Sequence, residues 1–422
     1  MIVGCKMKKI LIVSTNEEID EKIGSYINSE QMPNAEYTLV QERYGTMPLI
    51  KTYVDHYIPI YDIGDIDEVR NVAEQCRKWG PYDWIVQTDE YSVILKEKIY
   101  TILQEKNNTF TGEILRFRDK QIMKEKIKSI RVPQIYSMNQ LAKDDSKFPV
   151  IVKPRSFAAS EGIYFAKNYK ELQSIMNDNG LQVNTYDDNF DCMKYEEAEK
   201  QDVEIEEYID GKTYHIDGYI FNGMIEFCEA SQYLNSCLEF AHGKALGSLH
   251  VNDKHEQILW KQFVEKLHKD LHFPDGAFHV EAFKLENGER IFLELAIRPG
   301  GGLIVEMTEV AQGVDLLLAH ILCQIGEKPK RASRRTDEYG FLLMSNMSLP
   351  YANNKVKNVN KPKASVKTLI KADFPYDGDV IKKHHEYRDV YGEFMFMGEK
   401  RNQVKEDMLY IMDNYKIDVT EV

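Results

Sequence analysis

The sequence predicts an α/β protein with several lobes, and three observations support this fold class. Short β-branched apolar runs alternate with segments of helical spacing over the first 108 residues, which is typical of a doubly wound parallel sheet. From Phe110 onward the alternation gives way to separate strands, one clear hairpin and polar connections. The chain has 422 residues, which corresponds to about three lobes at about 150 residues each.

The N-terminal elements follow from local patterns. The run Lys8–Ser14 has the continuous apolar character of a buried parallel strand. Thr15 and Glu18 have the spacing of a capping box at the start of a helix. Residues 65–79 place their apolar side chains on one face and are predicted to form a second helix. Further strands are expected at 37–41, 57–60 and 84–87.

Three polar residues, Thr88, Asp89 and Glu90, directly follow the strand predicted at 84–87. Ligands of doubly wound sheets bind beyond the carboxyl ends of the strands. We therefore expect Asp89 and Glu90 to lie at a ligand-binding edge. The alternative is that these residues only cap the helix that follows.

Beyond residue 110 the sequence predicts a series of less regular elements. Strands are expected at 149–154, 203–209, 215–221, 340–344 and 393–397, and helices at 120–129, 169–176, 308–322 and 403–412. Residues 178–201 are polar and rich in Asn and Asp, which predicts a mobile loop.

The clearest hairpin covers 278–295 and places two carboxylates together. Asn287-Gly288 is a strong signal for a two-residue turn, which pairs residues whose numbers add up to 575. Glu281 and Glu294 then face each other, with Phe283, Leu285 and Phe292 expected on the same face. Two partly buried carboxylates require a counter-cation, and oxygen ligands suit Mg²⁺ or Mn²⁺. The alternative is a solvated face beside Arg290.

Arg298 follows Glu294 by four residues and precedes Pro299 and three glycines, of which Gly301 and Gly302 are the last two. A guanidinium group offers a bidentate fork to a carboxylate or a phosphate. Glycines allow backbone N–H groups to approach a ligand closely. The segment therefore predicts an anion site, with a simple turn as the alternative.

The composition limits the class of partner. Lys and Arg total 54 against 68 Asp and Glu, a net charge of −14, which argues against general affinity for nucleic acid or anionic membrane. No apolar run approaches the roughly 20 residues that span a bilayer. The six cysteines form no CxxC pair and are expected to be reduced thiols, so a cytoplasmic protein is predicted.

The sequence contains neither a Walker P-loop nor a strand–GxGxxG–helix motif, but it does contain a distributed set of phosphate-binding candidates. Lys120 opens a predicted helix, and Lys153 lies inside an apolar strand, where an unpaired ammonium group is costly. The small-residue loop 155–162 follows that strand, and the segment 206–211 ends another.

In this order the motifs resemble the ATP-grasp superfamily over roughly 110–322. The motifs are RDKQIMK at 118–124, FPVIVKP at 148–154, EEYIDG at 206–211, HVE at 279–281 and FLELAIRPGGG at 292–302. The resemblance implies an N-terminal pre-ATP-grasp domain (1–108), a small lid lobe (109–202), a large lobe with the hairpin (203–326) and a C-terminal lobe (327–422). It also implies that ATP is held between two sheets while a carboxylate is phosphorylated and then joined to a nucleophile.

The resemblance also implies roles for individual residues. Glu281 and Glu294 would hold Mg²⁺, with Mn²⁺ as an alternative, and Glu294, Lys153 and Arg298 would be catalytic. Arg298, Gly301, Gly302, Asp89 and Glu90 would contact the substrates. The ATP-binding residues implied are Lys120, Lys153, Ser156, Ala158, Ser160, Gly162, Glu206, Glu207, Ile209, Thr213 and Lys244.

The pattern Glu294-x-Ala296-x-Arg298 is similar to the L-amino-acid ligases, such as those of the bacilysin and rhizocticin pathways. Ala296 stands where many ATP-grasp enzymes have Asn, which leaves the number of metal ions open. The resemblance implies dipeptide synthesis from two L-amino acids, with a preference for a basic first amino acid, in a possible homodimer. The alternatives are a ligase for another carboxylate and a non-catalytic nucleotide sensor.

Overall fold

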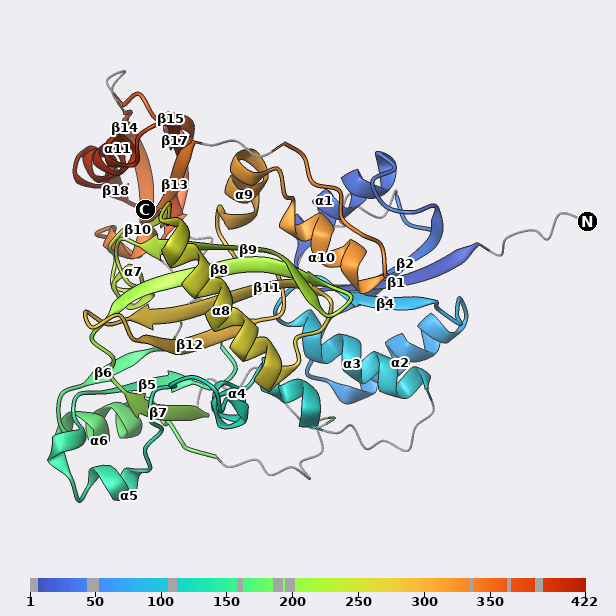
Figure 1. Cartoon of the computed structure of the whole chain (residues 1–422), viewed down its shortest axis with the longest axis horizontal. Helices are drawn as coiled ribbons and strands as arrows, with labels where there is room; N and C mark the ends of the chain where they lie inside the picture. The colour runs from blue at the N-terminus through green and yellow to red at the C-terminus, as the bar shows by residue number, and fades with distance from the viewer. Residues whose placement is uncertain are drawn as a thin grey trace, which may run out of the picture.

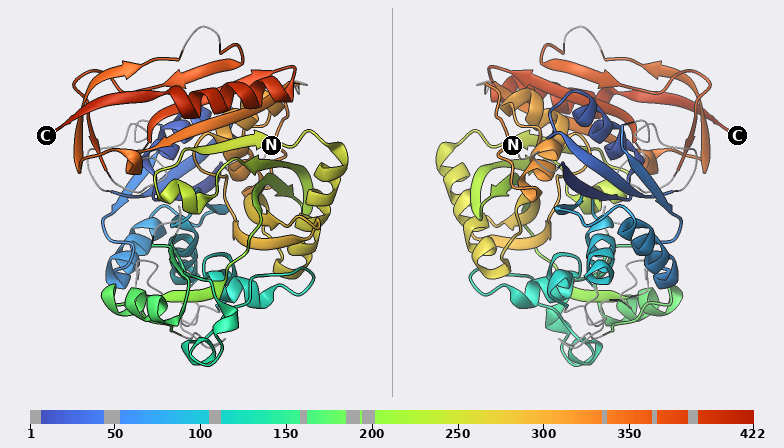
Figure 2. Two further views of the ribbon diagram at one scale, coloured as in Figure 1. Left: turned by 90° about the vertical axis from the view of Figure 1, so that its left-hand side faces the viewer. Right: turned by 90° about the vertical axis from the view of Figure 1, so that its right-hand side faces the viewer.

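The computed structural model describes residues 7–43, 53–104, 112–157, 162–184, 193, 202–333, 337–362, 366–383 and 390–422. Within these ranges the chain forms four sheets, of which the two that include the C-terminal strands alternate along the sequence (Figure 1). The small three-stranded sheet and the C-terminal strands lie at opposite ends of the molecule, with the largest sheet between them (Figure 2). No described helix is both long and apolar enough to cross a membrane.

The N-terminal sheet is parallel, has the order β3-β2-β1-β4 and carries helices on both faces, as the sequence predicts. Its apolar strand residues pack against α1 and α10 on one face and against α2 and α3 on the other. The elements are β1 (Lys8–Ser14), α1 (Glu17–Asn28), β2 (Ala35–Glu42), β3 (His56–Ile60), α2 (Ile66–Arg77), β4 (Trp84–Gln87) and α3 (Ser92–Leu103).

The predicted capping box at the start of α1 is wrong. Asn16 is the N-cap, and its side-chain oxygen accepts hydrogen bonds from the backbone N–H groups of Glu18 and Ile19. Asn caps as well as Thr does. Thr15 instead donates its backbone N–H to Asp89, 2.8 Å away, so it ties the end of β1 to the segment after β4.

The small sheet has the order β6-β5-β7 and packs its apolar face against α6. Its elements are β5 (Val150–Pro154), β6 (Tyr164–Ala166) and β7 (Val203–Glu207), with helices α4 (Lys120–Lys126), α5 (Met138–Leu141) and α6 (Tyr169–Asp178). Helix α4 ends at Lys126, before the predicted 129, because Ile127 is extended. Most of the predicted loop at 178–201 lies outside the described residues.

The large antiparallel sheet has the order β12-β11-β8-β9-β10-β13-β17-β15. Helix α8 covers one face, where Trp260 and Leu267 are fully buried (Figure 1). Its elements are β8 (Lys212–Phe221), β9 (Met224–Tyr233), α7 (Cys237–Ala241), β10 (Leu246–His250), α8 (Lys254–Leu271), β11 (Gly276–Lys284), β12 (Arg290–Ala296), α9 (Ile304–Gln312), α10 (Leu316–Gln324), β13 (Glu338–Ser345), β15 (Leu369–Asp373), β17 (Val390–Gly398) and α11 (Arg401–Asn414).

The single helix predicted over 308–322 is wrong, because two helices occupy this region. Helix α9 ends at Gly313, which has a φ of +66° and closes the helix in the left-handed conformation. Asp315 then accepts hydrogen bonds from the backbone of Leu317 and Leu318 and starts α10. Helix α10 packs against both the N-terminal sheet and strands β8 and β11, so it joins the first lobe to the large sheet.

The C-terminal strands β13, β15 and β17 extend the large sheet, and a separate sheet of order β16-β14-β18 lies beside α11. That sheet consists of β14 (Asn353–Asn360), β16 (Val380–Lys382) and β18 (Lys416–Glu421). Strand β7, which precedes the large sheet, pairs with β5 of the small sheet. The division into four domains stays a prediction. The pairing of β7 with β5 joins the region predicted as the large lobe to the region predicted as the lid lobe.

Candidate functional site

The hairpin of β11 and β12 forms with Glu281 directly opposite Glu294, as the sequence predicts. The turn itself differs from the prediction. Leu285 pairs with Glu289 across three residues, and Gly288 has a φ of +87°. A bulge between Glu281 and Ala282 then restores the predicted pairing of the two carboxylates.

Because of this bulge, one aromatic residue lies on the opposite face of the sheet from the one predicted. Phe292 pairs with Ala282 and lies in the core under α8, away from Glu294. Glu281 and Glu294 keep 15% and 29% of their side-chain surface exposed, so both carboxylates lie at a partly open surface. The predicted apolar face is therefore less apolar than expected, and the carboxylates remain accessible.

The two carboxylates have different partners. The Lys120 ammonium lies 2.9 Å from Glu294, and the same ammonium contacts the Phe157 carbonyl. Glu281 accepts a hydrogen bond of 3.1 Å from the Tyr233 hydroxyl and lies 3.5 Å from a His279 nitrogen. Two carboxylates that face each other at a partly open surface fit a divalent cation that prefers oxygen ligands, such as Mg²⁺, in addition to these contacts.

Lys120 is held in place by a buried ion pair. Arg155 forms two parallel hydrogen bonds of 2.9 Å with the Asp119 carboxylate, and both side chains are almost fully buried. Asp119 also caps α4, and the Lys120 backbone N–H donates to the Arg155 carbonyl at 2.9 Å. The sequence therefore fixes the start of α4 to the end of β5, which places Lys120 beside the large sheet.

Lys153 belongs to a second buried group on the small sheet. Its ammonium lies 2.6 Å from Glu206, and Lys124 from α4 contacts both Glu204 and Glu206. Burial by itself raises the pKa of Glu206, but Lys124 and Lys153 overcome this effect and hold that pKa below its usual range. The Lys124 pKa is correspondingly raised by the two carboxylates. The four charges neutralise one another.

The other predicted ATP residues are spread around these two groups. Glu207 is half-buried and paired with Arg131 at 2.6 Å, and Arg131 also reaches Glu289 of the hairpin at 3.3 Å. The remaining buried candidates are Ser156, Ile209 and Thr213. Gly162 has a φ of +71°, whereas Ala158 and Ser160 lie outside the described residues.

Lys244 does not join the site in this structure. Its side chain is 60% exposed, and its ammonium lies 2.6 Å from the Glu239 carboxylate. Glu239 and Ser236 form a capping box at the start of the short helix α7. The role of Lys244 in ATP binding stays a prediction.

Arg298 lies where the N-terminal lobe meets the large sheet. Its Nε atom is 2.5 Å from Glu90, and Glu90 also contacts Arg118, whose side chain is 1% exposed. Two guanidinium groups share one carboxylate, so the group keeps one net positive charge. That balance suits a substrate carboxylate or an acyl phosphate better than a basic side chain.

Asp89 shows the capping arrangement that the sequence left as an alternative. Its carboxylate accepts hydrogen bonds from the backbone N–H of Thr15 at 2.8 Å and of Ser92 at 3.1 Å, and from the Thr88 hydroxyl at 2.8 Å. The whole Asp89 residue is 5% exposed. These contacts fix the ends of β1 and β4 and occupy the carboxylate.

The glycine run has a packing reason in addition to any role in binding anions. A Cβ atom at Gly300 would lie 2.7 Å from Asp217 and 2.9 Å from His279. Gly302 has a φ of +58° and a Cβ there would meet Leu343 at 2.9 Å. Gly301 is exposed and precedes α9. The backbone after Arg298 therefore needs small residues to cross close to the sheet.

Sequence reasoning missed a buried polar group beside Glu281. His215 and Asp217 on β8 lie opposite Glu281 and His279 on β11. Burial by itself lowers the pKa of His279, but Asp217 and Glu281 overcome this and raise the pKa to about 9. The alternation His-x-Asp in β8 and His-x-Glu in β11 was the available signal, because both pairs share one face.

Both the sequence and the fold are similar to those of known proteins. Residues 146–307 match the family model of the ATP-grasp domain. The chain is 23% identical over 428 residues to an L-arginine-specific L-amino acid ligase from Bacillus subtilis, with 98% of both chains covered.

Two solved structures show the same fold. An L-amino acid ligase from Bacillus licheniformis has a TM-score of 0.70 at 15% identity and covers 99% of this chain and 100% of its own. The biotin carboxylase domain of a Hydrogenobacter thermophilus 2-oxoglutarate carboxylase, solved with MgADP, has a TM-score of 0.63 at 15% identity, covering 99% and 92%. The chain therefore has the fold of these two proteins, and its residues 146–307 match the ATP-grasp domain.

Proposed function

We propose that this ATP-grasp ligase joins the carboxylate of one L-amino acid to the amino group of another, with release of ADP and phosphate. The observation that carries the proposal is the pairing of Glu281 with Glu294 across the hairpin, with Arg298 directly beyond it and Lys120 at 2.9 Å from Glu294. A carboxylate pair with a lysine beside it, and an arginine four residues further along the chain, are the parts that phosphoryl transfer to a carboxylate requires.

Each residue has a task in this reaction. Lys120 and Lys153 would bind the phosphates of ATP, and Glu206, Glu207, Ile209 and Thr213 would surround the nucleoside. Glu281 and Glu294 would hold Mg²⁺, which neutralises charge on the phosphoryl group being transferred. Arg298 would bind the substrate carboxylate and stabilise the charge of the acyl phosphate and of the tetrahedral intermediate.

The reaction needs Glu90 to release part of its hold on Arg298. In this structure Glu90 occupies the guanidinium that a substrate carboxylate would use. Arg118 stays paired with Glu90, so a substrate can displace Glu90 from Arg298 without leaving a buried carboxylate unpaired. The substrate would thus complete the charge balance of this group.

A basic amino acid as one substrate is a further part of the proposal. The support is the printed name of the Bacillus subtilis relative, which is L-arginine-specific at 23% identity. Asp89 and Glu90 were expected to recognise the basic group, but their carboxylates already hold Ser92, Thr15, Arg118 and Arg298. The receptor for a basic side chain is therefore to be sought elsewhere at the site.

The test is a screen of amino-acid pairs with Mg-ATP, in which phosphate release and the mass of the product are measured together. Dipeptide with equal amounts of ADP and phosphate is expected. Arginine and its uncharged analogue citrulline should be compared, because they differ mainly in charge. AMP and pyrophosphate as products would reject the mechanism, and turnover only with a different class of carboxylate would reject the amino-acid assignment.

A further inference from the structure

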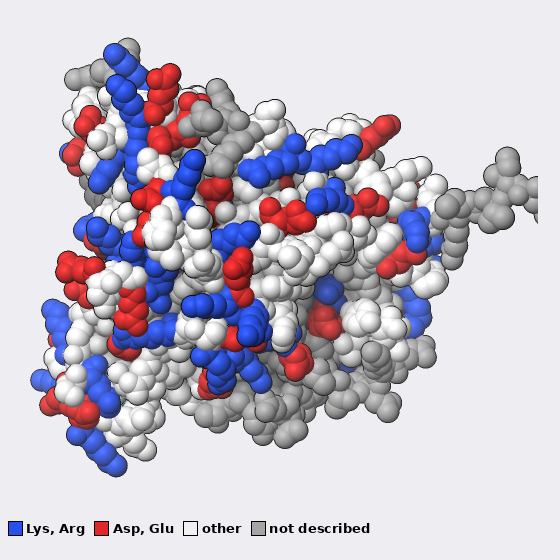
Figure 3. All heavy atoms as spheres, in the orientation of Figure 1, with Lys and Arg blue, Asp and Glu red and all other residues white. Residues whose placement is uncertain are grey.

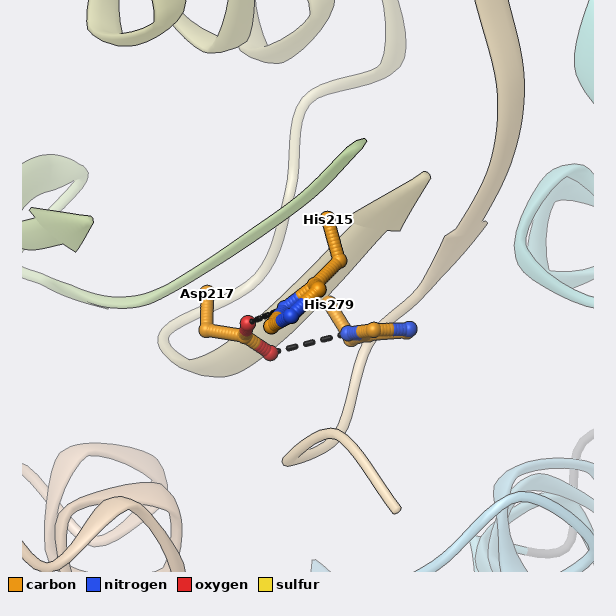
Figure 4. Close-up of side chains that lie close together, drawn as sticks. All are labelled: His215, Asp217 and His279. Carbon is orange, nitrogen blue, oxygen red and sulfur yellow. Dashed lines mark hydrogen bonds and ion pairs between the residues drawn. The ribbon is translucent and has the colours of Figure 1, made fainter. Parts of the chain in front are cut away.

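Behind Glu281 lies a chain of hydrogen-bonded side chains that the proposed reaction leaves unused. The Ser248 hydroxyl lies 2.6 Å from His215 Nε2, and His215 Nδ1 lies 2.5 Å from Asp217. On the other side of Asp217, His279 Nδ1 lies 2.8 Å from the second carboxylate oxygen. His279 Nε2 then faces Glu281 Oε1 at 3.5 Å. Figure 4 shows both imidazoles turned toward Asp217.

The strand pairing fixes this arrangement. Asp217 is directly opposite His279, and His215 is directly opposite Glu281, in the antiparallel ladder of β8 and β11. Residues two apart on a strand share a face, so all four side chains project from the same side of the sheet. The chain of contacts therefore follows from the register and not from a flexible loop.

Burial makes these contacts strong determinants of orientation. The side chains of His215, Asp217 and His279 are 4%, 6% and 12% exposed. A buried carboxylate is stable only when its oxygens are hydrogen-bonded, and Asp217 gives one oxygen to each imidazole. An imidazole whose Nδ1 is fixed in this way has its Nε2 fixed as well.

A metal ion held by His215, Asp217 and His279 is the obvious alternative, since their donor atoms lie within 4.8 Å of one another. Two ligands at about 2.1 Å from a tetrahedral ion stand about 3.4 Å apart. The measured separations of 2.5 Å and 2.8 Å are those of hydrogen bonds. The geometry favours a hydrogen-bonded network over a metal centre.

The contacts around Glu281 converge on one oxygen. Among the described residues, the Tyr233 hydroxyl at 3.1 Å, the Cys237 thiol at 3.5 Å and His279 Nε2 at 3.5 Å all face Oε1. Contacts that hold one oxygen of a carboxylate leave the other to bind a cation. The network thus lies on the side of Glu281 that is not needed for the metal.

We propose that His279 is a positioning residue, which Asp217 orients so that its Nε2 holds Glu281 in the conformation that binds the Mg²⁺ of the nucleotide complex. His215 and Ser248 complete the support by fixing Asp217 from the other side. The inference rests on the proposed function only in assigning Glu281 as a metal ligand. It does not depend on which carboxylate or amine the enzyme joins.

The test measures binding of ADP by calorimetry with and without Mg²⁺, using two substitutions that divide the role of His279. His279→Asn keeps an amide near the position of Nδ1 and loses the group facing Glu281. His279→Gln places its amide near the position of Nε2. Outer partners of metal ligands typically contribute about 10–100-fold in affinity. We expect His279→Asn to lose about that much of the gain that Mg²⁺ gives ADP binding, and His279→Gln to lose less.

A matched control lies on the same sheet face. His250 is 7% exposed in its side chain, lies 3.0 Å from Glu229 and does not contact Glu281. His250→Asn should leave the gain from Mg²⁺ unchanged, and binding of ADP without Mg²⁺ should be the same in all variants.

Three results would overturn the inference. They are equal losses in His279→Asn and His250→Asn, a wild-type protein that gains nothing from Mg²⁺, and bound zinc that is lost from the His279 variants. A protein that behaves as expected here but forms no dipeptide would refute the proposed function and leave this inference standing. Thermal unfolding of each variant identifies losses due to misfolding.

Discussion

The two sheets that face each other in this protein carry charged groups of opposite character. On the small sheet, Lys124 and Lys153 are buried with Glu204 and Glu206, and the four charges cancel. On the large sheet, Glu281 and Glu294 are partly exposed, and each has one positive neighbour, His279 beside Glu281 and Lys120 beside Glu294. The first group is buried, whereas the second is open to a ligand.

This difference separates positioning from chemistry. A buried group with cancelling charges holds its members in fixed positions, so Lys153 and Glu206 are oriented before any ligand binds. A partly exposed pair of carboxylates has free oxygens and retains its charge for a ligand. The same residue types, lysine and glutamate, therefore serve different purposes on the two sheets.

The largest expected effect is that of Glu294→Ala, which removes one of the two partly exposed carboxylates of the hairpin. Turnover should fall by more than the roughly 10–100-fold that outer partners of a metal ligand contribute. The melting temperature should change little, because the side chain is 29% exposed. Phosphate release and thermal unfolding measure the two effects.

Glu289→Gln is the matched control for that variant, since Glu289 lies on the same hairpin and is 40% exposed. It should retain turnover. If Glu294→Ala remained active while Glu289→Gln did not, the metal assignment would be wrong.

In the buried group of Lys124, Lys153, Glu204 and Glu206, a substitution is expected to change mainly the stability of the protein. Lys124→Met should lower the free energy of unfolding by about 3–5 kcal/mol, because it leaves two buried carboxylates with a single ammonium, that of Lys153. Urea denaturation measures the loss. The double substitution Lys124→Met with Glu204→Gln should recover part of it, since the charges balance again. A single variant as stable as the wild type would show that the group is not a closed unit.

The smallest effect is expected at the surface. Lys244→Ala removes an exposed ion pair with Glu239, which is worth about 0–1 kcal/mol. Its stability should be nearly that of the wild type. The KM for ATP provides the informative measurement. A value within about threefold of the wild type would place Lys244 outside the ATP site, whereas a tenfold increase, about 1.4 kcal/mol, would show that it moves in on binding.

The amino-acid sequence predicts the hairpin pairing well and its neighbourhood poorly. The predicted pairing of Glu281 with Glu294 is correct although the turn has three residues and not two. The bulge between Glu281 and Ala282 compensates for the extra turn residue. Turn length and bulge position are decided by packing under α8, where Phe292 is buried. Such packing depends on residues far away in the sequence.

The buried charged groups show the same limit. Lys124 and Glu204 are 80 residues apart, so their pairing cannot be read from local patterns. His215 and His279 were recognisable as alternating polar residues in strands, but their partner Asp217 is revealed only by the register of β8 and β11. The C-terminal strands β14 and β18 were missed because their residues are largely exposed and polar.

On the surface, Lys and Arg side chains are interspersed with Asp and Glu over the face seen in Figure 3. Both signs occur on that face, and the whole chain carries 68 acidic against 54 basic residues. In the proposed function, nucleotide recognition depends on individual cations such as Lys120 and Lys153, and not on a general field of the protein.

The contacts of Arg131 affect how the small sheet and the large sheet can move relative to each other. It links Glu207 at the end of β7 with Glu289 at the tip of the hairpin, and its backbone carbonyl accepts a hydrogen bond from Phe292. A link at one edge of two sheets favours rotation of one sheet against the other about that edge. Arg131 then lies near the axis of such a rotation, which in the proposed function would open and close the nucleotide site as a hinge.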